Sequence, residues 1–145
     1  MMSKNNQPIP DWLFDCVQEV RDLFGLGGVE WSFCVKLSDK PGGRDNWEGS
    51  AATDYQYLDA RLEFTDCIKP GNDAREAVLH EVGHVAHAEI DGVVDMILRQ
   101  LDDERRSHFT ELYTGAVERY LQRLSRALVY NIRPKEEDGK TDLLP

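Results

Sequence analysis

The stretch from Ala74 to Glu89 constrains the fold of this chain more than any other segment. It contains the motif H-E-x-x-H at residues 80–84, within a run whose apolar residues recur at the spacing of an amphipathic helix. At about 100° per residue, His80 and His84 lie only ~40° apart round such a helix and ~6 Å apart along it. Two imidazoles placed in this way can bind one metal ion, so the segment is predicted to be a helix that carries a metal site.

Glu81 and the clustering of histidines extend this prediction to a catalytic zinc site. Glu81 lies about 60° from His84 round the helix, beside the metal rather than on it. A carboxylate in that place can accept a proton from a zinc-bound water and so act as the general base. The alternative interpretation is a helix whose histidines are merely exposed. It does not explain why three of the chain's four histidines fall within eight residues. One Zn²⁺ ion bound by His80 and His84 is therefore the expected cofactor.

A catalytic zinc ion takes three protein ligands and a water, so another segment must supply the third ligand. His87 stands a further ~4.5 Å along the helix axis from His84, beyond the ion, and is expected beside the site or on the surface. Acidic side chains on a long helix predicted over residues 107–130 can reach the site if that helix returns antiparallel. The candidates there and just before it are Glu104, Glu111 and Glu118, with His108 as an outsider. The spacing alone does not choose among them.

The remaining residues predict a small α+β domain. Alternation of apolar and polar residues marks three strands, and their short connections indicate an antiparallel meander. The H-E-x-x-H helix is expected to end near Ile90, ahead of Asp91 and Gly92, with residues 93–101 as a short helix or a covering loop. The other predicted elements are a first helix over residues 11–24 and strands over residues 29–37, 47–53 and 59–65.

Length, charge and cysteine content limit the number of domains and the partners. The 145 residues suit one domain, placed at residues 11–130 between a flexible start at 1–10 and a disordered charged tail at 131–145. A formal net charge of −10 argues against nucleic acid and anionic membranes as partners. The polar start lacks the apolar core of a signal peptide, so a cytoplasmic location is expected. The three cysteines form no C-x-x-C pair and are expected to be buried as small apolar residues.

Two segments together resemble the small zincin-type metallopeptidases encoded by bacteriophages and prophages. The first is residues 79–84, with the H-E-x-x-H motif, and the second is residues 114–121, on the later helix. In those proteins the later helix carries a pattern similar to V-E-R-x-x-R-x-L, and residues 117–124 here read V-E-R-Y-L-Q-R-L, which departs from it after the arginine. In the broader gluzincin group, a glutamate on a helix after the motif is the third zinc ligand. The resemblance assigns that role to Glu118.

The resemblance also implies a fold and a way of binding substrate. The fold is a zincin-like minimal metallopeptidase fold: a first helix, a small, mostly antiparallel three-stranded sheet, the active helix and a closing helix. A peptide or protein substrate would lie along the edge strand beside the active helix, which the resemblance places at residues 59–65. Tyr113 or Tyr120 could assist an oxyanion, although packing in the core is the more expected role for each.

The expected function is that of a zinc-dependent metallopeptidase, and two other classes of function compete with it. One is a non-catalytic, zinc-stabilised binding or regulatory module of phage or prophage origin, in which the ion only holds a small domain together. The other is a metal-free interaction protein with an acidic face. Glu81 favours the enzyme over the zinc-stabilised module, because a purely structural site has no need of a general base.

Overall fold

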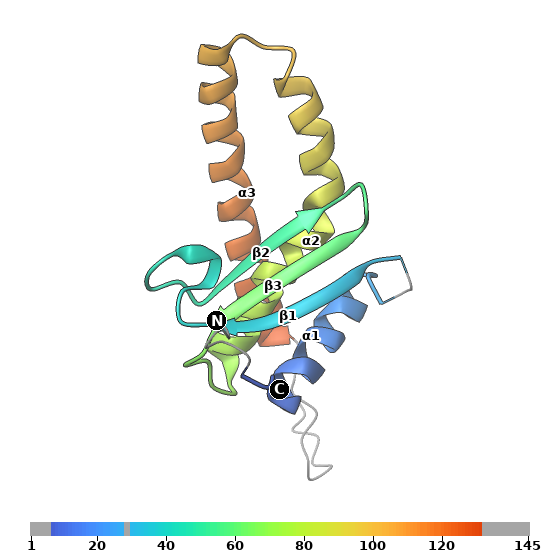
Figure 1. Ribbon diagram of the computed structural model, residues 1–145, viewed down its shortest axis with the longest axis vertical. Coiled ribbons are helices and arrows are strands. Elements are labelled where there is room, and N and C mark those ends of the chain that lie inside the picture. Colours follow the sequence, from blue (N-terminus) through green and yellow to red (C-terminus); the bar gives the residue numbers. More distant parts are fainter. Residues whose placement is uncertain (1–6, 28–29, 132–145) are drawn as a thin grey trace, which may run out of the picture.

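The structure, a computed structural model, describes residues 7–27 and 30–131 of the chain. Within them, three α-helices and a three-stranded mixed sheet form an α+β fold, which confirms the predicted class (Figure 1). The elements are α1 (Asp11–Leu23), β1 (Ser32–Ser38), the short 3-10 helix η1 (Pro41–Gly43), β2 (Gly49–Asp54), β3 (Asp59–Thr65), α2 (Asn72–Leu98) and α3 (Asp103–Asn131). The predicted flexible start and disordered tail lie outside the described residues except at 7–10 and 131.

The sheet corrects the predicted antiparallel meander. The strand order is β1-β3-β2, with β3 antiparallel to β2 but parallel to β1, so the sheet is mixed and β3 is its central strand. A tight turn joins β2 to β3, where Asp54 Oδ1 accepts hydrogen bonds from the backbone N–H groups of Gln56 and Tyr57. As the central strand, β3 is flanked on both sides, and its inward side chains are the most deeply buried of the sheet. These are Ala60, Leu62 and Phe64, all fully buried.

The core lies between one face of the sheet and the helices α1 and α2, which Figure 1 shows behind the strands. Leu13, Val17 and Val20, which share one face of α1, are buried there. The opposite face of the sheet carries polar side chains such as Arg61, which is exposed. Of the cysteines, Cys16 is buried as expected, whereas Cys34 and Cys67 are exposed, so the expectation for those two is wrong.

The helices α2 and α3 form an antiparallel hairpin that extends well past the sheet (Figure 1). The predicted end of the H-E-x-x-H helix near Ile90 is wrong, because α2 continues through Gly92 to Leu98. A glycine costs a helix only about 1 kcal/mol relative to alanine, which contacts with α3 can offset. The turn between the helices is held by the guanidinium of Arg106, which donates to the carbonyls of Leu98 and Leu101.

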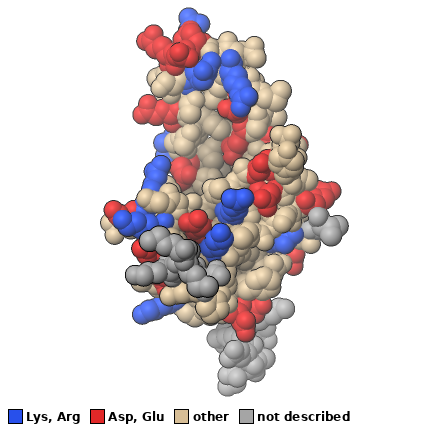
Figure 2. Space-filling model, viewed as in Figure 1, with Lys and Arg blue, Asp and Glu red and all other residues tan. Residues whose placement is uncertain are grey.

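The surface of this fold mixes charges of both signs. Figure 2 shows acidic and basic side chains interspersed over the visible face. Several lie in pairs on one helix, such as Arg106 with Asp103 on α3 at 3.3 Å. None of the helices within residues 7–27 and 30–131 is long and apolar enough to cross a membrane.

Candidate metal centre

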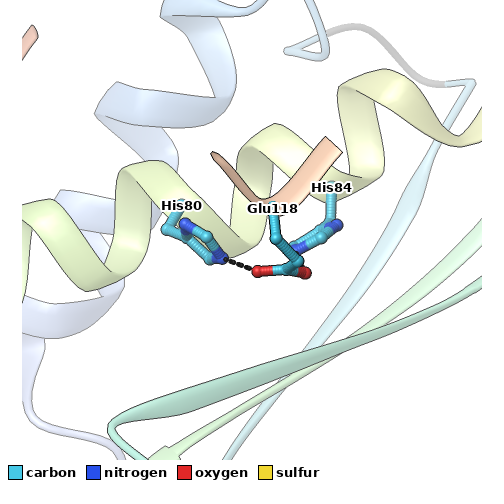
Figure 3. A group of neighbouring side chains, drawn as sticks. All are labelled: His80, His84 and Glu118. Atoms are coloured by element: carbon cyan, nitrogen blue, oxygen red, sulfur yellow. Dashed lines mark hydrogen bonds and ion pairs between the residues drawn. The ribbon is translucent and has the colours of Figure 1, made fainter. Parts of the chain in front are cut away.

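The helix α2 places the imidazoles of His80 and His84 side by side. They are one turn apart, and their ring centroids lie 4.9 Å from each other with the rings inclined at 77°. This closeness follows from the four-residue spacing alone, because residues four apart fall on the same face of a helix. Both Nε2 atoms point to the same side, away from the core and toward α3 (Figure 3).

The third member of the site is Glu118, which α3 brings to α2 from 38 residues away in sequence. One carboxylate oxygen of Glu118 lies 3.1 Å from His80 Nε2 and the other lies 2.9 Å from His84 Nε2. The three ligand atoms lie within 4.8 Å of one another. Two imidazole nitrogens and a carboxylate oxygen are a donor set that divalent transition-metal ions accept, so the residues present fit such an ion.

The other acidic or histidine candidates for the third ligand lie elsewhere on α3. Glu104 is exposed in the first turn of α3, close to the end of the hairpin that is far from the sheet. Glu111 is also exposed and lines a separate surface hollow with Asp103 and Arg106. The ring of His108 lies beside that of Phe109, with centroids 5.6 Å apart. Among the described residues, only Glu118 joins the two histidines in a group that could hold a metal ion.

His87 and the two tyrosines are also placed by the structure. His87 Nδ1 lies 2.9 Å from Asp91 Oδ1, one turn further along α2 and outside the group of ligand atoms. Tyr113 donates its hydroxyl hydrogen to Asp91 at 2.6 Å. Tyr120 is half exposed and is not among the residues that line the cavity at the site. The geometry therefore gives neither tyrosine a place beside the histidine pair, and the contact among His87, Asp91 and Tyr113 was missed by sequence reasoning.

Glu81 is buried beside the histidines, with only 8% of its surface exposed. Burial, and secondarily the charge of Glu118, raises the pKa of Glu81 to about 8, because a carboxylate is poorly solvated there. Burial also lowers the pKa of His84; nearby His80 acts in the same direction, while Glu118 opposes both. A cation near these groups would favour the ionised carboxylate and the neutral imidazole, which are the forms a metal site needs.

A cavity of about 540 Å³ opens between α2, α3 and β2, and the site forms part of its wall. On the sheet side it is lined by residues 46–51, which include the first half of β2. Gly49 lies against the general-base candidate, since a Cβ there would come within 3.0 Å of Glu81 Cγ. The lack of a side chain at Gly49 therefore leaves room for Glu81.

The strand beside the site is β2, and this corrects the prediction that residues 59–65 form the edge. Strand β3, at those residues, is paired on both sides, whereas β2 pairs only with β3 among the strands of the described part of the chain.

Comparisons with known proteins find no family model, no curated protein and no solved structure that matches the chain. Its function is therefore inferred from the residues of the site.

Proposed function

We propose that this protein is a zinc-dependent metallopeptidase of the zincin type, with His80, His84 and Glu118 as metal ligands and Glu81 as the general base. The observation that carries the proposal is the approach of Glu118 to both Nε2 atoms, at 3.1 and 2.9 Å. An H-E-x-x-H helix supplies two of the three protein ligands of a catalytic zinc site, and a carboxylate from another helix can supply the third. The resemblance of residues 79–84 and 114–121 to phage and prophage zincins supports the same assignment.

The chemistry assigned to Glu81 follows from its position and its burial. Zinc, when bound by the three ligands, supplies a Lewis acid and lowers the pKa of water from about 15.7 to near 7. The carboxylate of Glu81 then accepts the proton of the attacking water and delivers it to the nitrogen of the leaving amine. Without metal, burial raises the pKa of Glu81 to about 8, and the charge of a bound cation would lower it again, which favours the ionised carboxylate that a general base requires.

The substrate is proposed to be a peptide or protein segment that binds as an extra strand along β2. The residues of β2 that line the cavity are small, namely Gly49, Ser50 and Ala51, so another backbone can approach them closely. Strand addition supplies backbone hydrogen bonds that do not depend on the side chains of the substrate. It would place a peptide bond in the cavity between β2 and the His80–His84 pair.

Metal content and cleavage by a Glu81→Gln variant test this proposal. Protein purified without added zinc should contain about one equivalent of zinc, and the wild type should cleave members of an unbiased peptide library. The Glu81→Gln variant should keep the zinc but lose cleavage, because an amide cannot act as a general base. A matched control is Glu89→Gln, on the same helix but outside the cavity, which should cleave as the wild type does.

The alternatives predict different outcomes of the same experiment. Zinc without any cleavage by the wild type would favour the zinc-stabilised binding module. Protein that takes up no metal would favour the metal-free interaction protein. Equal cleavage by the wild type and by Glu81→Gln would show that Glu81 is not the general base.

A further inference from the structure

Four polar side chains follow one stripe of α2 and meet α3 in two groups. His80, His84, His87 and Asp91 fall within about 60° of one another round the helix and span ~16 Å along it. The first two contact Glu118, as described above. The last two contact Tyr113, which precedes Glu118 on α3 by just over one helical turn. We call His87, Asp91 and Tyr113 the tyrosine cluster.

The tyrosine cluster is a close hydrogen-bonded contact between the two helices. The Tyr113 hydroxyl donates to Asp91 Oδ1 at 2.6 Å, and the same oxygen lies 2.9 Å from His87 Nδ1. The phenol oxygen also lies 3.5 Å from that nitrogen, so the three groups contact one another. Burial, together with the hydrogen bond to Asp91, raises the pKa of the Tyr113 phenol, which therefore keeps its proton and donates it at neutral pH.

The position of Glu118 depends on how α3 is held. Its side chain is 50% exposed, and the only hydrogen bonds or ion pairs of its carboxylate within the described part of the chain are those with the two imidazoles. On the C-terminal side of Glu118, α3 is fixed by buried apolar residues. Leu121 packs so closely on Gly83 that a Cβ there would come within 3.0 Å of Leu121 Cδ2. The absence of a side chain at Gly83 thus lets α3 approach α2 closely.

On the N-terminal side of Glu118, apolar packing against α2 is much weaker. Phe109 and Leu112, both in this part of α3, are about half exposed. The tyrosine cluster is the hydrogen-bonded contact between the described parts of α2 and α3 on this side, until Arg106 closes the turn. Glu118 therefore lies between an apolar contact on one side and a polar contact on the other.

We infer that the tyrosine cluster is a positioning element, which fixes α3 against α2 and thereby sets the affinity of the site for its metal ion. The inference rests on the proposed metal site and adds residues that do not touch the ion. Without the Tyr113 hydroxyl, the segment of α3 between Arg106 and Glu118 loses its side-chain hydrogen bond to α2, and Glu118 is less often within reach of both imidazoles. Side chains that hydrogen-bond directly to metal ligands typically change metal affinity by about 10- to 100-fold, and the tyrosine cluster, which acts through the position of α3, is expected at the lower end of that range.

The test compares Tyr113→Phe with Tyr120→Phe. Each removes one hydroxyl from α3, but Tyr120 is half exposed and its hydroxyl has no hydrogen-bond partner among the described residues, so Tyr120→Phe is the matched control. The zinc dissociation constant is measured by competition with a chromophoric chelator, without any substrate. Tyr113→Phe should weaken zinc binding about tenfold, while Tyr120→Phe should bind as the wild type does.

Two further measurements separate positioning from general stability. Urea unfolding of the zinc-free proteins shows whether Tyr113→Phe is folded under the conditions of the zinc titration. In Asp91→Asn the amide oxygen can still accept from Tyr113, so this variant should bind zinc more tightly than Asp91→Ala. This pair also tests the cluster independently of Tyr113→Phe.

Equal affinities of the wild type, Tyr113→Phe and Asp91→Ala would overturn the inference while leaving the metal site intact. A wild-type protein that binds no zinc would overturn the metal site, and the inference with it.

Discussion

Replacing Glu81 by glutamine should change how the stability of the zinc-free protein depends on pH. Burial raises the pKa of Glu81 from 4.5 to about 8, so the folded protein keeps a proton there that the unfolded chain releases. Below pH 4.5 both states are protonated and the group has no effect on the folding equilibrium. Between pH 4.5 and about 8 the unfolded state gains by ionising, so the wild type loses stability as the pH rises.

The size of this loss follows from the width of the window. One pH unit between the two pKa values corresponds to about 1.4 kcal/mol. Over the roughly three units from pH 5 to pH 8, the wild type should lose about 2–4 kcal/mol more than Glu81→Gln, whose side chain does not titrate. All other titrating groups are common to both proteins, so the difference between the two curves isolates Glu81.

Urea unfolding of chelator-treated protein, followed by circular dichroism at several pH values, gives the two curves. Glu111→Gln is the matched control, because it removes a carboxylate from an exposed position on α3, and its curve should run parallel to that of the wild type. If Glu81→Gln also runs parallel to the wild type from pH 5 to pH 8, the carboxyl group is not in the buried environment described here, and the reasoning is wrong.

Two further predictions concern the third ligand and the space around the general base. Glu118→Ala should weaken zinc binding by at least tenfold, whereas Glu111→Ala should leave the affinity measured by chelator competition nearly unchanged. Gly49→Ala would place a Cβ 3.0 Å from Glu81 Cγ and 3.1 Å from Phe64 Cδ1. Because Phe64 is fully buried and cannot move aside easily, the variant should lose about 1–3 kcal/mol of unfolding free energy in urea. Wild-type stability of Gly49→Ala would contradict the close packing of β2 on Glu81.

The features that the sequence by itself determined are those that local periodicity controls. The pairing of the His80 and His84 rings follows from the pitch of one helix, whatever surrounds it. The strand at residues 59–65 was predicted with its observed bounds, because alternation with a period of two is a property of the segment itself. Spacing alone left several candidates for the third ligand open. The resemblance of residues 79–84 and 114–121 to zincins singled out Glu118 among them.

Tertiary structure decided the features that depend on which segments meet. The choice of β3 as the central strand, with β1 parallel to it, rests on pairing between residues far apart in sequence, which no local pattern encodes. The continuation of α2 through Gly92 likewise depends on contacts with α3 that offset the poor helix propensity of glycine. Gly49 is understood only once Glu81 is seen against it. Contacts between distant segments thus determine where the open edge of the sheet lies and how the carboxylate of Glu118 reaches the histidine pair.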